Sequence, residues 1–111
     1  MTVVTVYAVF ADAAEAEAIG RAMIEERRAA CVNILGCCQS IYRWDEVIET
    51  VVEVPALFKT TPDQADALIA RIAKLHSYDT PAIVTWPIDK LLARYGDWVE
   101  ENVRRSAGES G

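Results

Sequence analysis

The chain has 111 residues, of which 52% are hydrophobic and 25% are charged, and its formal net charge is −6. This size and apolar content predict one domain with a packed core and exclude a disordered chain. The acidic balance and the scattered basic residues argue against nucleic-acid binding, which depends on phosphate neutralisation by Lys and Arg. No apolar stretch approaches the roughly 20 residues that a membrane-spanning helix needs. The first residues do not resemble a secretion signal, so we expect a cytoplasmic protein with reduced thiols.

The first predicted elements are a buried strand and a helix. Residues 3–10, VVTVYAVF, are almost all β-branched or aromatic, which is typical of a strand buried on both faces. Asp12 can accept a hydrogen bond from the backbone of Glu15, whose side chain can reach back, so the pair predicts a capping box. Apolar residues then recur at helical spacing, and we expect the helix to reach about Arg28.

A long hairpin is predicted next. Residues 30–43 and 47–59 indicate two strands that are joined by a turn near Asp45. Gly36 predicts a bend in the first strand, because glycine inside a strand pattern often marks a bulge. Pro55 cannot donate to a sheet ladder, so we expect the second strand to be an edge strand or to be broken there.

The second half of the chain predicts a helix, a short strand and a helical C-terminus. The helix begins with a Thr61 hydroxyl cap and Pro62, and a turn at 77–81 and a strand at 82–86 follow it. One or two helical turns are expected within 89–95. The last helix is predicted to run from an Asp97–Glu100 capping box to about Arg105. The order βαββαβ with a C-terminal helix predicts an α+β, ferredoxin-like fold. We expect one domain over residues 1–105 and a disordered tail over residues 106–111.

The two hairpin strands are too long for the helices that should cover them. Each has about 13 residues and could reach roughly 40 Å, whereas a 15-residue helix is only about 22 Å long. The far end of the hairpin carries apolar and aromatic side chains, namely Ile41, Tyr42, Trp44, Val47 and Ile48. A small monomer rarely exposes so much apolar surface. We therefore expect identical subunits to cover one another's hairpins.

Four stretches of the sequence resemble a known family. "AACVNIL", "SIYRW", "FKTT" and "LHSYDTPAI" occur in the order and spacing of the CutA divalent-ion tolerance proteins, from about residue 4 to residue 103. The resemblance implies a ferredoxin-like fold, a homotrimer similar in plan to the PII signalling proteins, and a cytoplasmic location. It also implies a role in tolerance to copper or another divalent cation, with no enzymatic reaction. We expect no metal to be required for folding.

The resemblance also points to individual residues. The cysteine of the family's A-C-V-N segment falls on Cys31 and the histidine of its L-H-P-Y-D segment falls on His76, which makes these two the predicted metal contacts. The cleft that the family forms between subunits would involve Trp44, Lys59 and Tyr78. Family members often carry glutamate where this chain has Ala82, glycine where it has Glu46, and leucine or isoleucine where it has Pro55.

Each of these residues also has a structural explanation. Cys31 in a buried strand is compatible with simple core packing. His76 ends a helix, where a positive charge would stabilise the negative end of the helix dipole. Lys59 is compatible with a solvated strand end, and the aromatic residues are compatible with packing.

Further candidate metal contacts lie on the hairpin. Cys37 and Cys38 are neighbours in a strand, so their side chains point to opposite faces, which indicates small residues at a bend. The alternative is that a kink at Gly36 lets the two thiols bind Cu(I) or become oxidised. Glu49 and Glu53 share one face of a strand, which indicates a solvated face or a weak attraction for divalent cations.

The sequence leaves three functions and argues against catalysis. A nucleophilic pair of Cys31 and His76 would lack an orienting acid and an oxyanion hole. The first function is a CutA-type homotrimer that binds copper or another divalent cation. The second is a PII-like trimer that binds a small anionic metabolite in the cleft between subunits. The third is a structural assembly that docks another protein.

Overall fold

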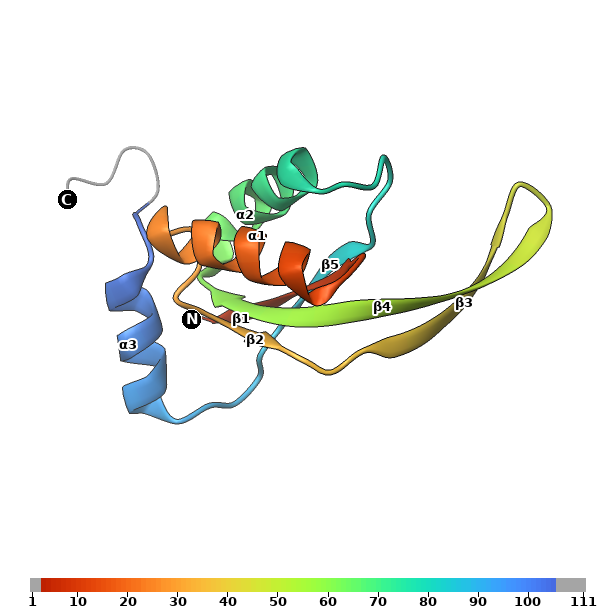
Figure 1. The fold of residues 1–111 in the computed structure, drawn as a ribbon. Helices are drawn as coiled ribbons and strands as arrows, with labels where there is room; N and C mark the ends of the chain where they lie inside the picture. Colours follow the sequence, from red (N-terminus) through yellow and green to blue (C-terminus); the bar gives the residue numbers. More distant parts are fainter. Residues whose placement is uncertain (1–2, 106–111) are drawn as a thin grey trace.

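A computed structural model of the chain describes residues 3–105 (Figure 1). Its elements are β1 (Val4–Phe10), α1 (Ala13–Glu25), β2 (Cys31–Ile34), β3 (Cys38–Trp44), β4 (Val47–Thr60), α2 (Pro62–Leu75), β5 (Ile83–Pro87) and α3 (Ala93–Asn102). The predicted α+β plan with a C-terminal helix is therefore confirmed, with the first hairpin strand divided into β2 and β3. The tail predicted over 106–111 lies outside the described residues. No helix within 3–105 is long and apolar enough to span a membrane.

One antiparallel sheet forms the centre of the molecule, and α1 and α2 cover one of its faces (Figure 1). The strand β4 lies between β1 and the β2–β3 side of the hairpin, and β5 pairs with the other edge of β1. Alternate side chains of β1 and β4 point toward the helices and are fully buried, including Val6, Ala8 and Phe10 from β1 and Ala56 and Phe58 from β4. This apolar layer is the main core of the protein.

The two predicted helix starts have the expected positions but different hydrogen bonds. Asp12 Oδ1 accepts from the backbone N–H of Glu15 at 2.8 Å, as predicted, whereas Glu15 Oε1 accepts from the N–H of Ala11 rather than from Asp12. At α2, Pro62 occupies the first turn, but the Thr61 hydroxyl makes no capping bond, so that part of the prediction is wrong. The first helix ends at Glu25, before the predicted Arg28, because the chain turns into a left-handed conformation.

Pro55 lies inside a continuous central strand, and the prediction of an edge strand or a break in β4 is wrong. Pro55 pairs with Val9 of β1, and its carbonyl accepts from the N–H of Leu35 on the other side. In an antiparallel strand the nitrogen and the carbonyl of one residue point the same way, so the missing donor faces the gap between β2 and β3. The residue opposite, Leu35, lies just after the end of β2 and is exposed, so the missing donor falls at the end of a ladder and not within it.

The C-terminal helix begins earlier than predicted. The helix α3 starts at Ala93, and Asp97 lies inside it, so the predicted Asp97–Glu100 capping box is wrong. Apolar residues decide the boundaries of this segment, because Leu91, Tyr95 and Val99 pack with Val103 against a small second core. That core includes Val3 and Ala30, so α3 closes the end of the sheet opposite the hairpin (Figure 1).

The hairpin extends beyond the helices, as the strand lengths predict (Figure 1). The molecule measures 49 × 26 × 24 Å, and β3 and β4 form its long arm. The β4 side chains that face the helices form a row that continues onto this arm, where Val52 and Ile48 are 65% and 63% exposed. Ile41 of β3 lies on the same face of the arm and is 64% exposed. We name Ile41, Ile48 and Val52 the arm row.

Candidate functional site

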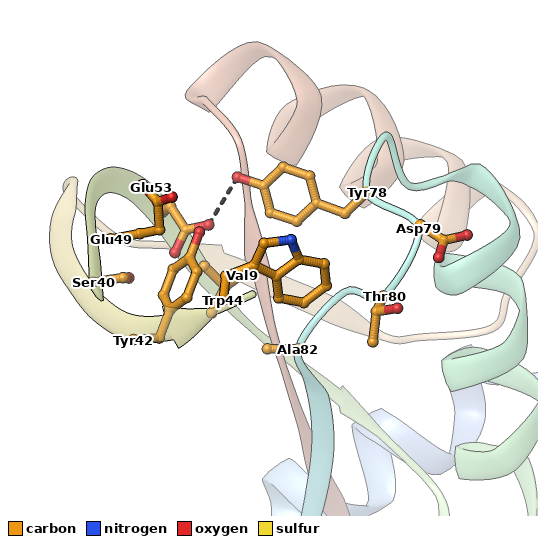
Figure 2. A pocket seen from close by; sticks show the side chains of 10 residues that line it. All are labelled: Val9, Ser40, Tyr42, Trp44, Glu49, Glu53, Tyr78, Asp79, Thr80 and Ala82. Atoms are coloured by element: carbon orange, nitrogen blue, oxygen red, sulfur yellow. Dashed lines mark hydrogen bonds between the residues drawn. The ribbon is translucent and has the colours of Figure 1, made fainter. Parts of the chain in front are cut away.

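A pocket lies where the arm meets the turn after α2 (Figure 2). Its volume is about 580 Å³, and it is lined by Val9, Ser40, Tyr42, Trp44, Glu49, Glu53, Tyr78, Asp79, Thr80 and Ala82. The arm residues among them come from one face of the hairpin, because Tyr42 pairs with Glu49 and side chains alternate along each strand. Figure 2 shows aromatic rings from the arm and the turn around the pocket, with carboxylates on two sides.

A hydrogen bond between Tyr78 and Glu53 connects the turn to the arm. The Tyr78 hydroxyl donates to Glu53 Oε2 at 2.8 Å, and Glu53 is only 6% exposed (Figure 2). Burial, followed by the hydrogen bond to Glu53 and its negative charge, raises the pKa of Tyr78 to about 12. The hydroxyl therefore stays protonated at neutral pH and remains a donor to Glu53.

His76 is held against Tyr78, which lines this pocket. One ring nitrogen, Nδ1, accepts the backbone N–H of Tyr78 at 3.0 Å, so the proton must be on Nε2, which lies 2.8 Å from the carbonyl oxygen of Val9 and donates to it. The imidazole side chain is fully buried and stacks on Phe10. These contacts tie the end of α2 to β1 through a neutral ring. A metal could bind His76 only by replacing one of the two hydrogen bonds.

Glu15 completes the hydrogen bonds around His76. Its Oε2 accepts the backbone N–H of Ser77 at 2.7 Å, in addition to the bond from Ala11 to Oε1. Burial would raise the pKa of Glu15, but the hydrogen bonds from Ala11 and Ser77 lower it by more, so the net shift is downward. The first turn of α1 thereby holds the start of the turn at 77–81.

The predicted site residues do not all meet within one chain. Trp44 and Tyr78 line the same pocket of one chain, whereas Lys59 does not; the predicted cleft between subunits stays a prediction. Lys59 pairs with Thr5, four residues along β1 from Val9, which is roughly 13 Å away. Its Nζ donates to Asn33 Oδ1 at 3.3 Å.

The other predicted metal contact, Cys31, lies at the same end of the sheet as Lys59, with which it pairs. Its Sγ is 3.3 Å from the hydroxyl of Tyr95. Burial, and after it the hydrogen bond with this thiol, raises the pKa of Tyr95. Cys31 is half-buried and His76 is at the other end of β1, so one chain does not bring these two residues together.

Cys37 and Cys38 lie at the break between β2 and β3, at the predicted bend. Both are free thiols, Cys37 is exposed and Cys38 is half-buried. Cys38 Sγ is 3.7 Å from the Ser40 hydroxyl. Among residues 3–105, no group of three or more His, Cys, Asp or Glu side chains could hold a metal ion.

The sequence did not identify the pocket as such. The shared face of Glu49 and Glu53 was visible from the period of a strand, but nothing local showed that this face would meet the turn at 77–81. No sequence pattern marked Asp79 as a pocket residue, because an acidic residue in a turn is usually solvated. Among the described lining residues none is Lys, Arg or His, so an anionic ligand would face three carboxylates and no positive charge.

Comparison with known proteins places this geometry in a family. The family model of the CutA1 divalent ion tolerance protein matches residues 4–102. The chain belongs to the CutA family. The divalent-cation tolerance protein CutA of Thermus thermophilus is 42% identical over 87 residues, which cover 78% of this chain and 84% of the relative. CutA of Thermotoga maritima is 37% identical over 100 residues, which cover 90% of this chain and 98% of the relative.

Solved CutA structures have the same fold. CutA from Xylella fastidiosa matches with a TM-score of 0.91 and 33% identity, covering 94% of this chain and 100% of that one. The match confirms the family resemblance and the ferredoxin-like fold that the sequence predicted. CutA-family membership connects the chain to divalent-cation tolerance, while its own described residues do not assemble a metal site within one copy.

Proposed function

We propose that this chain is a non-enzymatic divalent-cation tolerance protein that acts as a cytoplasmic homotrimer and binds copper or another divalent cation. The family match over residues 4–102 is the observation that carries the proposal. The arm row supports the oligomer, because three large apolar side chains about two-thirds exposed on one face are costly to leave in water.

Assembly also explains how a metal site could form from this chain. One copy offers scattered thiols and no converging ligand group among its described residues. A symmetric oligomer repeats each ligand, so one half-buried thiol from each copy can supply several ligands to one ion. We propose Cys31 as the first contact and His76 as the second. His76 joins only if the metal displaces the N–H of Tyr78 from Nδ1.

A metal titration of the full chain tests this proposal. Copper, as Cu(II) and as Cu(I) under reducing conditions, is titrated into the wild type and into Cys31→Ser, His76→Ala and Cys37→Ser, with the stoichiometry per chain as the measurement. Cys31→Ser should lower the stoichiometry or the affinity, whereas Cys37→Ser reports on the alternative copper site at the bend, where this thiol is exposed. Unchanged binding in both Cys31→Ser and His76→Ala would contradict the proposed site.

The titration also separates a metal role of His76 from a structural one. His76→Ala removes the bonds to Val9 and Tyr78, so its melting temperature should fall whatever the metal does. Loss of copper at a temperature where the variant is still folded would assign His76 to the metal. The oligomer and the cytoplasmic location are tested separately, by the mass in solution and by cell fractionation.

A further inference from the structure

Glu53 is a buried carboxylate with no positive partner. The residue is 6% exposed, and within residues 3–105 the one hydrogen bond of its carboxylate comes from Tyr78 and it forms no salt bridge. Burying a charge is costly unless it is paired, and a single neutral hydroxyl compensates it only in part. The side of Glu53 that faces the pocket is therefore a favourable place for a cation.

The rest of the pocket has the same sign of charge. Glu49 and Asp79 line it together with Glu53, and the lining residues include no basic side chain to offset them. Carboxylates around one concave site focus a negative potential and raise the local concentration of cations. Within one chain, this charge favours a cationic ligand over an anionic one.

The walls of the pocket select the kind of cation. Tyr42 and Trp44 from the arm and Tyr78 from the turn surround the same space (Figure 2). Aromatic faces attract alkylammonium groups by about 0.5–2 kcal/mol at each contact. A small hard metal ion instead needs several converging oxygen ligands, and the described part of the chain has no such group.

We propose that this pocket binds a small organic cation that carries an alkylammonium group, with Glu53 as its counter-ion and Tyr42, Trp44 and Tyr78 as its aromatic walls. The volume of about 580 Å³ is in the range of small-molecule sites. Neither of the proposed copper contacts, Cys31 and His76, lines the pocket, although His76 accepts the backbone N–H of Tyr78. The pocket lies on the face of the arm opposite the arm row.

Calorimetric titration of the full chain with tetramethylammonium chloride tests the proposal. Sodium chloride keeps the ionic strength constant, so that general screening does not change between injections. Tert-butanol, an uncharged molecule of similar bulk, is the ligand control. We expect saturable binding of tetramethylammonium in the millimolar range and binding of tert-butanol at least about tenfold weaker.

Two variants assign the binding to the pocket. Glu53→Gln removes the charge and keeps an oxygen that accepts from Tyr78, and Trp44→Leu removes an aromatic wall that is 54% exposed and unimportant for the core. Each should weaken tetramethylammonium binding by about tenfold. Glu46→Gln and Trp98→Leu make the same chemical changes outside the pocket and should bind like the wild type.

Several results would overturn the proposal. These are no saturation by tetramethylammonium at tens of millimolar, equal binding of tert-butanol, or wild-type binding in both Glu53→Gln and Trp44→Leu. Displacement by calcium chloride at equal concentration would assign the carboxylates to a metal instead. A short peptide with trimethyllysine that binds more tightly than tetramethylammonium would show that the cation belongs to a protein and is not a small molecule.

Discussion

Replacing Val52 by lysine is expected to dissociate the proposed assembly. Val52, Ile48 and Ile41 are 65%, 63% and 64% exposed in one copy. Complete burial of such a side chain contributes about 1.5–3 kcal/mol, so covering the exposed two-thirds contributes about 1–2 kcal/mol for each residue and about 3–6 kcal/mol for the arm row of one subunit.

The lysine removes one of these contributions and adds the cost of desolvating an ammonium group. A loss of about 3 kcal/mol for each contact between subunits would raise its dissociation constant by about two orders of magnitude. The side chain is solvent-exposed in the single chain, so the fold of each subunit should be retained.

Light scattering coupled to size exclusion, over a range of micromolar concentrations, measures the effect. The wild type should have the mass of three 12.3 kDa chains, about 37 kDa, and Val52→Lys should approach the mass of one chain. Leu92→Lys is the matched control, because Leu92 is 61% exposed and lies before α3, at the end of the molecule opposite the arm. A wild type that stays monomeric at every concentration would refute the reasoning, and so would a Val52→Lys variant with the wild-type mass.

Three further predictions concern single residues. Glu46 has a φ of 67° in the turn at the arm tip, so Glu46→Gly should raise the free energy of unfolding by about 0.5–1 kcal/mol in denaturant titrations. Asp45→Gly should raise it less, because aspartate adopts this conformation more readily. An equal or larger increase for Asp45→Gly would contradict the explanation. The pKa of Glu15 is lowered in the folded protein, so its contribution to stability is complete above the ordinary pKa of 4.5 and is lost as the pH falls through the folded pKa. The difference in melting temperature between the wild type and Glu15→Gln should therefore shrink on acidification. A difference that stays constant with pH would contradict this reasoning. Tyr78→Phe leaves the Glu53 carboxylate without its hydrogen bond and should destabilise the fold by about 1–3 kcal/mol in thermal melts. Tyr42→Phe, which changes another tyrosine of the same pocket, should have little effect. Equal effects of the two variants would show that the bond to Glu53 is unimportant for stability.

Much of the fold could be predicted because its signals are local. The β-branched run of β1, the Asp12 cap and Pro62 at the start of α2 each act within a few residues, and all three elements are where they were predicted. The excess length of the arm also follows from the sequence, because the rise per residue of a strand is about twice that of a helix. Local signals failed at Asp97, where packing of Tyr95 and Val99 outweighed a capping pattern.

The sequence by itself determined the order of the elements and the long arm, whereas only the tertiary structure decided which of its residues meet. Pro55 is tolerated in a central strand because the gap between β2 and β3 lies opposite its nitrogen, which is a matter of register. The pocket likewise depends on a contact between Tyr78 and Glu53, which are 25 residues apart in the chain. Periodicity shows that two side chains share a face, but it cannot show what that face will contact, because pairing between distant segments is set by the packing of the whole sheet.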